Sequence, residues 1–235
     1  MVLDIEGTTT PMAFVHGTLY SYARDHLGAF VRDPAHAELI ATLAPQFAAE
    51  HHGEPASGFP PEWRAEPRTA LLDSIEAYAM WLMDRDRKST PLKTLQGRIW
   101  AIGYRAGLLR GAVFPDVAPA LRRWHAAGLV LAVYSSGSVE AQRLIFSMTD
   151  EGDLTPLITY FFDTMVGPKR SADSYPRIAS EMGIDAAHIL FLSDVAAELE
   201  AALASGWQVI LTVRPDHFAP NPGGFEQVTT FDALQ

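Results

Sequence analysis

Three short runs of apolar residues in the second half of the chain predict buried β-strands. The runs cover residues 129–134, 189–192 and 209–213, and each follows a segment with helical spacing. Continuous apolar runs of this length are typical of strands buried on both faces, as in a parallel sheet. A further, very short strand is predicted at Val2 and Leu3.

The segments beside these strands predict helices that end at glycine. Residues 119–127 are followed by Gly128, and residues 195–205 are followed by Gly206. Glycine is favoured just beyond a helix because it adopts left-handed backbone angles without strain. The alternation of helices and buried strands predicts right-handed βαβ units, and therefore an α/β fold with a doubly wound, mostly parallel sheet.

Residues 11–110 carry no strand pattern and interrupt this alternation after the first strand. Apolar residues recur there at helical spacing, and one such set is Leu71, Ile75, Tyr78 and Leu82. Proline-rich residues 54–67 predict a loop between two helices. We therefore predict a Rossmann-like α/β core over residues 1–12 and 112–235, with an inserted all-helical domain over residues 13–111.

The composition predicts an ordinary soluble protein with an acidic surface. Its formal net charge of -10 argues against nucleic acid or an anionic membrane as a partner, because both attract basic surfaces. No apolar run approaches the roughly 20 residues that span a bilayer, and the first residues lack the pattern of a signal peptide. The absence of cysteine excludes a thiol nucleophile. We expect a cytoplasmic monomer that acts on a small molecule.

Polar residues follow the predicted strands at the edge of the sheet where ligands bind in open α/β folds. Each lies just after an apolar run or one turn into the next helix. The set is Asp4, Glu6, Ser135, Ser136, Gly137, Lys169, Asp194 and Glu198. Because the carboxyl ends of parallel strands share one edge, we expect these residues to converge on one crevice.

These residue types suit the transfer of a phosphoryl group. Asp4 at a strand end can attack phosphorus in line and form an aspartyl phosphate, which water then hydrolyses. Glu6 is placed to protonate the leaving oxygen and later to activate that water. Ser136, with N–H groups near Gly137, would bind the phosphoryl oxygens, and Lys169 would neutralise the developing charge.

The acidic members of the set fit a magnesium ion. Mg²⁺ prefers hard oxygen ligands and keeps several waters, so Asp4, Asp194 and one carbonyl would suffice as protein ligands. Such an ion also supplies local attraction for a phosphate ester, which the acidic chain as a whole does not. The sequence therefore predicts a Mg²⁺-dependent phosphohydrolase.

Each of these residues alone has an ordinary structural interpretation. Asp4 and Glu6 are compatible with a solvated turn, the serines within residues 135–138 with a helix cap, and Lys169 with a solvated loop. Asp194 would then cap a helix, whose positive end Glu198 would favour. All of these residues lie after predicted strands, and helix caps or loop residues that are unrelated to one another would not need to do so. The common position therefore favours the interpretation that they form one functional site.

Several other residues are expected to have structural roles only. We expect four residues to pack the helical domain, namely Met80, Trp81, Met83 and Trp100. We assign no metal-binding role to His16, His51 or His52, because no set of zinc ligands accompanies them.

The ordered motifs resemble those of the haloacid-dehalogenase-like superfamily of phosphatases. The matching features are an Asp-x-Glu-Gly-Thr run at Asp4, a serine after a strand at Ser136, Lys169, and an acidic strand end at Asp194. The segments DIEGTTTPMAFVH, DRKSTPLKTLQG and SSGSVEAQ resemble one branch more closely, the enolase-phosphatases or acireductone synthases of methionine salvage. The resemblance spans nearly the whole chain.

This resemblance implies a bifunctional reaction with Mg²⁺ as cofactor. The substrate implied is 2,3-diketo-5-methylthiopentyl 1-phosphate, and the products are acireductone and phosphate. The helical insertion would be a cap, and the backbone carbonyl of Glu6 would join Asp4 and Asp194 at the metal. Phosphate-binding residues would be Ser135, Ser136, Gly137 and Lys169, and candidate cap residues facing the site are Arg87, Lys88, Lys93 and Gln96.

Three alternatives stay open at this level. The first is a phosphatase of the same superfamily that acts on another small phosphate ester. The second is a dehalogenase, which also uses an aspartate nucleophile but needs no metal. The third is an inactive binding module, although no essential carboxylate or lysine is missing. The base for enolisation is not identified, and we hypothesise that Glu6 or Asp4 lies near the proton that is removed.

Overall fold

A computed structural model describes residues 1–215 and 220–234. The chain divides into two compact units. Unit 1 comprises Met1–Gly17 and Gly107–Gln235, and unit 2 comprises Thr18–Ala106, so unit 2 is inserted into unit 1. The predicted domain boundaries, after residue 12 and after residue 111, stay a prediction, as does the role of the insertion as a cap.

Unit 1 is built on a parallel sheet with the strand order β3-β2-β1-β4-β5-β6. The strands are β1 (Val2–Leu3), β2 (Ala132–Tyr134), β3 (Tyr160–Phe162), β4 (Leu190–Ser193), β5 (Gln208–Thr212) and β6 (Gln227–Val228). All neighbouring pairs are parallel. The short β1 lies in the centre, where Leu3 pairs with Val133 on one side and with Leu192 on the other.

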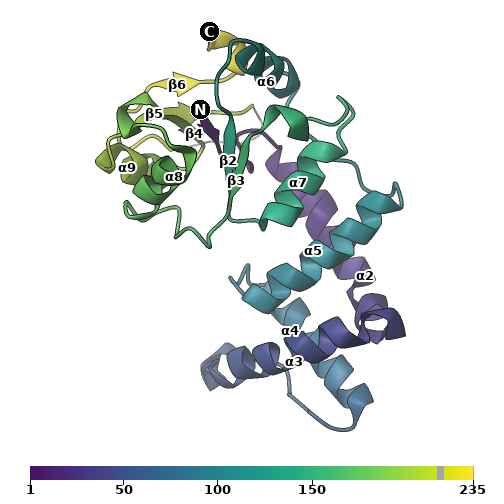
Figure 1. Ribbon diagram of the computed structural model, residues 1–235. Helices are drawn as coiled ribbons and strands as arrows, with labels where there is room; N and C mark the ends of the chain where they lie inside the picture. Colours follow the sequence, from purple (N-terminus) through teal and green to yellow (C-terminus); the bar gives the residue numbers. More distant parts are fainter. Residues whose placement is uncertain (216–219, 235) are drawn as a thin grey trace. The chain divides into compact units, whose positions relative to one another are not determined.

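Helices cover both faces of this sheet. They are α6 (Val117–Ala126), α7 (Val139–Ser147), α8 (Ser174–Met182) and α9 (Ala196–Ala204). Figure 1 shows α6 and α7 on one side of the strands and α8 and α9 on the other. The strand order runs outward from β1 in both directions, and right-handed crossovers then place helices on opposite faces. The predicted doubly wound α/β fold is confirmed.

Strand boundaries differ from the predicted ones where pairing and burial do not coincide. β2 begins at Ala132 rather than at residue 129, because its pairing with both β1 and β3 begins there. Leu131 is nevertheless fully buried, so the apolar pattern extends beyond the paired residues. The strand β6 was not predicted, because Gln227 is exposed and the strand has no apolar run.

The predicted glycine stops after two helices are confirmed. Gly128 follows α6 with a φ of +81°, and Gly206 follows α9 with a φ of +84°. Shorter helical turns also occur among the described residues. They are α1 (Met12–Phe14), a π-helix (Val15–Tyr20), and 3-10 turns at Pro34–His36, Ala56–Gly58, Thr155–Leu157, Ala186–His188 and Phe231–Ala233.

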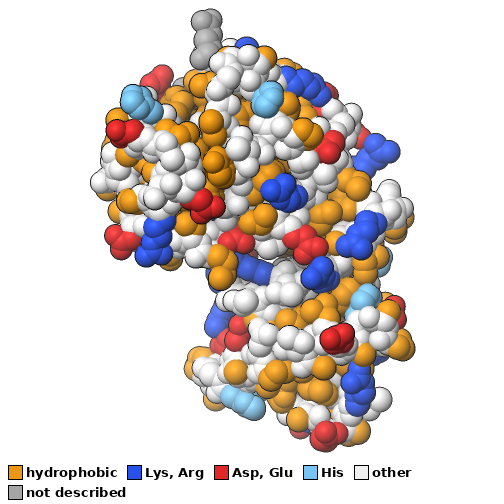
Figure 2. All heavy atoms as spheres, viewed as in Figure 1, with side chains coloured by type: hydrophobic (Ala, Val, Ile, Leu, Met, Phe, Trp, Pro, Cys, Tyr) orange, Lys and Arg blue, Asp and Glu red, His pale blue; other side chains and the backbone are white. Residues whose placement is uncertain are grey.

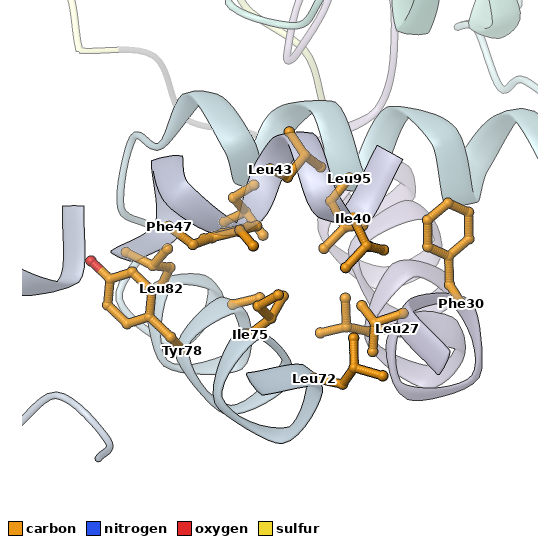
Figure 3. Packing of buried hydrophobic residues seen from close by; sticks show 14 of the residues in the cluster. Leu27, Phe30, Ile40, Leu43, Phe47, Leu72, Ile75, Tyr78, Leu82 and Leu95 are labelled. Carbon is orange, nitrogen blue, oxygen red and sulfur yellow. The ribbon is translucent and has the colours of Figure 1, made fainter. Parts of the chain in front are cut away.

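Unit 2 is helical, and within residues 18–106, all of which the structure describes, no strand occurs. Its longer helices are α2 (Ser21–Arg32), α3 (Ala37–His52), α4 (Arg68–Met83) and α5 (Thr90–Arg105). Leu27, Ile40, Ile75 and Leu95, one from each helix, point into a common apolar core (Figure 3). Trp81 is part of this core, and Met80, Met83 and Trp100 pack against it, as predicted.

The helices and the drawn surface can be compared with what a membrane span or a basic field would require. Among the described residues, no helix combines the length and apolar character needed to cross a bilayer. On the face drawn in Figure 2, basic and acidic side chains are interspersed rather than gathered into one basic field.

Candidate active site

Asp4 lies at the carboxyl end of β1 in a closely hydrogen-bonded loop. Its N–H donates to the carbonyl of Leu192 in β4 (2.9 Å). The N–H groups of residues 8–10 all donate to the carbonyl of Ile5, at 2.8 to 3.2 Å. The Thr9 hydroxyl donates to the carbonyl of Asp4 (3.0 Å). The buried threonine run therefore fixes the strand end that presents Asp4.

Gly7 allows this loop to turn against Asp194. Its φ of +71° lies in the left-handed region that glycine adopts without strain. A Cβ atom at this position would lie only 2.4 Å from Asp194 Oδ2. Because any side chain would displace that carboxylate, the glycine is needed both for the turn and for the approach of Asp194.

Lys169 is buried between two carboxylates. Its Nζ lies 2.5 Å from Asp4 Oδ1 and 2.6 Å from Glu198 Oε2. Burial alone would lower the pKa of Lys169, but the charges of Asp4 and Glu198 outweigh burial and raise that pKa above its ordinary value. Lys169 is therefore a permanent positive charge in contact with the predicted nucleophile.

The segment after β3 fixes the position of Lys169. Gly167 has a φ of +146°, and a Cβ there would lie 2.2 Å from Ser174 Oγ. The Tyr134 hydroxyl donates to the Gly167 carbonyl (2.9 Å), and the Tyr175 hydroxyl donates to the Lys169 carbonyl (2.5 Å). The ring of Tyr134 also lies 5.8 Å from the Lys169 Nζ, within the range of a cation–π interaction.

Glu198 belongs to this cluster rather than to a solvated helix end. Its Oε2 accepts a hydrogen bond from Ser193 Oγ (3.0 Å) in addition to the contact with Lys169. Burial, followed by the charge of Asp4, raises the pKa of Glu198. The N-cap residue of α9 is Val195, whose side chain makes no capping hydrogen bond. Asp194 lies one residue before this position, so it is not the N-cap residue of that helix.

Asp194 is a buried carboxylate close to another one. Burial, and then the negative charge of Asp4, raises the pKa of Asp194 to about 8. A divalent cation held by both carboxylates would relieve this repulsion. Within residues 1–215 and 220–234, no group of three or more His, Cys, Asp and Glu side chains is placed to hold a metal. Two carboxylates and the Glu6 carbonyl, all hard oxygen donors, fit Mg²⁺ without such a group.

The turn after β2 presents serines at the same edge of the sheet. β2 pairs directly with β1, so Ser135 follows a strand adjacent to the one that ends in Asp4. The buried Ser135 Oγ accepts a hydrogen bond from the Gly137 N–H (3.2 Å). Ser138 Oγ accepts from the first turn of α7 at 3.3 Å. Ser138 therefore caps α7. Ser136 lies in the turn between Ser135 and Ser138.

Glu6 has a neighbour that the sequence did not indicate. His16 Nε2 lies 2.8 Å from Glu6 Oε1, and both side chains are partly exposed. Glu6 forms a β-bridge with Thr10, so the chain folds back after the turn. We assigned no metal-binding role to His16, and its contact with the predicted acid/base is a finding of the structure.

The candidate cap residues of unit 2 lie around the start of α5. Arg87 Nη2 lies 2.6 Å from Glu54 Oε1, in the predicted loop. Lys88 is exposed, Lys93 is partly exposed, and Gln96 is buried. Their part in a substrate site stays a proposal.

Comparison with known proteins identifies the family. A sequence model of the haloacid dehalogenase-like hydrolases matches residues 1–206. Enolase-phosphatase E1 of Synechococcus elongatus is 44% identical over 235 residues, covering 100% of this chain and 96% of the relative. Enolase-phosphatase E1 of Klebsiella pneumoniae is 46% identical over 235 residues, covering 100% and 95%. The chain belongs to the enolase-phosphatase E1 family. It is thus a phosphatase among the haloacid dehalogenase-like hydrolases.

Solved structures share the fold of this chain. UTR4 protein from Saccharomyces cerevisiae is 30% identical, with a TM-score of 0.77 over 99% of this chain and 98% of that chain. CbbY from Rhodobacter sphaeroides, at 16% identity and a TM-score of 0.58, covers 99% of this chain and 94% of its own, and shares the fold.

Sequence reasoning missed two contacts that this enolase-phosphatase family member makes around its predicted site. Ser193 lies directly before Asp194 at a strand end, a position that could have drawn attention to it. Its hydroxyl lies 3.4 Å from Asp4 Oδ2. The contact between His16 and Glu6 had no comparable signal, because it depends on how the chain returns after the Gly7 turn.

Proposed function

We propose that this protein converts 2,3-diketo-5-methylthiopentyl 1-phosphate to acireductone and phosphate in methionine salvage. Membership of the enolase-phosphatase E1 family supports this substrate. The observation that carries the proposal is the contact of Lys169 with Asp4 in a buried cluster beside Asp194. A phosphatase for another small phosphate ester is the second candidate, because the same cluster would serve it.

The phosphatase step begins with Asp4. One carboxylate oxygen attacks phosphorus, the bond from phosphorus to the ester oxygen breaks, and an aspartyl phosphate forms. Lys169, already at 2.5 Å from Asp4 Oδ1, neutralises the charge that develops on the phosphoryl oxygens. Ser136 and the N–H groups near Gly137 hold those oxygens in place.

Glu6 handles the protons of this step. It donates a proton to the leaving ester oxygen, and its carboxylate then removes a proton from the water that hydrolyses the aspartyl phosphate. The organic product leaves with the proton from Glu6 on its oxygen, phosphate leaves with the hydroxyl group of the water, and the second proton of that water restores Glu6 as Asp4 is regenerated. His16, at 2.8 Å, orients the Glu6 carboxylate.

Magnesium is the proposed cofactor, held by Asp4, Asp194 and the backbone carbonyl of Glu6. Support comes from the hard-oxygen donor set and from the raised pKa of Asp194, which burial and the charge of Asp4 bring to about 8. When bound, Mg²⁺ offsets negative charge and so lets a carboxylate approach a phosphate.

Enolisation would use the same site. The proton next to a substrate carbonyl is removed before ester cleavage, and we propose that Glu6 or Asp4 lies near it, with Ser135 stabilising the enolate. The test is solvent-deuterium exchange into the substrate by an Asp4→Asn variant. Exchange at the wild-type rate would show that enolisation does not require Asp4. Loss of exchange in the folded variant would show that enolisation requires Asp4.

We further propose that the protein acts as a cytoplasmic monomer, with unit 2 as its cap, and that it binds neither nucleic acid nor membranes. The acidic net charge of -10 supports the last point, because polyanions would be repelled. Sedimentation of the purified protein tests the monomer directly. A stable dimer at micromolar concentration would overturn it.

A further inference from the structure

Arg214 is a buried charge that contacts the loop following Asp4. It follows β5 by two positions, and only 3% of its surface is exposed. It lines a cavity of about 380 Å³, together with Phe114 and Asp116 among others. None of the residues in the proposed phosphoryl-transfer step lines this cavity, so the buried arginine needs another explanation.

The guanidinium group contacts the loop that carries the predicted nucleophile. Arg214 Nε donates to the carbonyl of Thr8 (2.8 Å), across 206 positions of sequence. Thr8 is completely buried, and its N–H donates to the carbonyl of Ile5. The neighbouring carbonyl, that of Thr9, accepts from the N–H of Phe114 (3.0 Å). Two outside donors therefore hold the loop between Asp4 and Thr10.

A rigid frame fixes the orientation of Arg214. Its Cζ lies 4.4 Å from the ring centroids of both Phe114 and Phe231. Its Nη1 lies 2.7 Å from Asp116 Oδ2, and the same oxygen accepts from the Phe231 N–H (2.6 Å). Since Asp116 and the two rings already anchor the group, the Nε donor is free to be aimed at Thr8.

The role of Arg214 follows from the fact that different nitrogen atoms of its guanidinium group bind Asp116 and Thr8. A guanidinium keeps several donors in one plane, so one atom can serve Asp116 while another holds a loop carbonyl. A simple ion pair would need only the contact with Asp116. The contact with Thr8 instead reaches the loop that follows Asp4 and contains Glu6.

We infer that Arg214 is a positioning residue, which holds the loop at residues 5–10 so that Asp4 and Glu6 keep their places for the reaction. It touches no reacting group itself. The kinetic part of this inference rests on the proposed function. Loss of Arg214 should lower kcat more than it changes KM. The reason is that the loop positions the nucleophile and the acid/base, and not the residues that bind the substrate tail.

The variant that tests it is Arg214→Met with Asp116→Asn. This pair removes both buried charges together, while methionine keeps apolar contact with the two rings and asparagine can still accept from the Phe231 N–H. The matched control is Arg123→Met. Arg123 also binds the end of the chain, through the carbonyls of Phe231 (2.9 Å) and Leu234 (3.0 Å), but it makes no recorded contact with the loop among the described residues.

We expect the double variant to lower kcat for phosphate release by roughly tenfold or more, with KM changed by less than about threefold. Arg123→Met should keep both constants within about twofold of wild type. The Arg214→Lys variant should lie between wild type and the double variant, because one ammonium reaches the Thr8 carbonyl or Asp116 but cannot hold both in a plane.

Amide hydrogen exchange supplies a readout that does not depend on the substrate. The double variant should exchange faster at residues 7–10, while the strands of the sheet stay protected as in wild type. Unchanged exchange at the loop with unchanged kcat would overturn the inference, and so would a uniform loss of protection, which would make Arg214 a residue of general stability. If the wild-type protein does not turn over the diketo ester, the proposed function is wrong. Amide hydrogen exchange at residues 7–10 still tests whether Arg214 holds the loop.

Discussion

Lys169 Nζ lies 2.5 Å from Asp4 Oδ1, although 165 positions separate the two residues in sequence. The same Nζ lies 2.6 Å from Glu198 Oε2, so the ammonium is shared between the predicted nucleophile and a second buried carboxylate. When Asp4 turns toward phosphorus, Glu198 can retain Lys169 in the cluster. In the proposed reaction, Lys169 would therefore bring its charge to the phosphoryl group while it stays paired with Glu198.

Replacing Asp4 by Asn removes the nucleophile but keeps the shape and the hydrogen-bonding capacity of the side chain. We expect phosphate release to fall by roughly a thousandfold or more, because Asp4 is the proposed acceptor of the phosphoryl group. Steady-state phosphate release measures this, with circular dichroism to establish folding. Asp25→Asn, at an exposed position of α2, is the control and should keep wild-type activity. Substantial release by folded Asp4→Asn would exclude Asp4 as the acceptor.

Glu198→Gln should lower kcat by roughly three- to tenfold, because Lys169 loses the charged partner that holds it while Asp4 reacts. Glutamine keeps an oxygen that can accept from Ser193, so the hydrogen bond seen at 3.0 Å can persist. The control is Glu200→Gln, two positions along α9 on the exposed side. Equal kcat for both variants in a phosphate-release assay would show that Glu198 does not hold Lys169 for the reaction.

The stability of the metal-free protein should decrease as pH rises. The pKa of Asp194 is raised from 3.8 to about 8 by burial and then by the charge of Asp4. Between these values the folded state binds more protons than the unfolded chain, so the free energy of unfolding falls through this interval. The total change is on the order of a few kcal/mol. Glu198, whose pKa is also raised, acts in the same direction.

Urea unfolding in EDTA at about pH 5 and about pH 8 measures this dependence. Asp194→Asn should have a flatter dependence than wild type, since the titrating group is gone. Adding Mg²⁺ at the higher pH should restore stability, because the ion binds the ionised carboxylates of the folded state. A free energy of unfolding that rises from the lower to the higher pH in wild type, with no difference from Asp194→Asn, would contradict the assignment.

The helical unit should respond to a cavity in its own core. Ile75 is completely buried among residues from the neighbouring helices (Figure 3), and Ile75→Ala should cost about 2–5 kcal/mol of stability. Phe59 is 82% exposed, and Phe59→Ala should change stability by less than about 0.5 kcal/mol. Urea unfolding followed by circular dichroism compares the two. Similar losses for both variants would mean that Ile75 does not anchor the core.

Much of the sheet could be predicted because buried parallel strands carry their own signal. The apolar runs that end near Asp194 and Ser135 belong to β4 and β2, and polar residues beyond them share one edge. β6 gave no such signal, since half of this short strand is exposed. The first and last residues of a strand depend on which residues pair with the neighbouring strand. An apolar run in the sequence does not specify that register.

The partners of the candidate residues were harder to predict than the residues themselves. The sequence placed Glu198 one turn into a helix, where a carboxylate favours the positive helix end, and only the fold brings it to Lys169. Arg214 reaches Thr8 across 206 positions, and His16 reaches Glu6 through a turn at Gly7. Such contacts depend on tertiary approach, which local spacing does not specify.

One assay tests the central claim most directly. Purified protein is mixed with 2,3-diketo-5-methylthiopentyl 1-phosphate and Mg²⁺, and acireductone and inorganic phosphate are measured in the same sample. We predict that both products form in equal amounts, and that Asp4→Asn and EDTA each abolish phosphate release. Failure of the folded protein to form either product, or phosphate release that EDTA leaves unchanged, would contradict the proposed function.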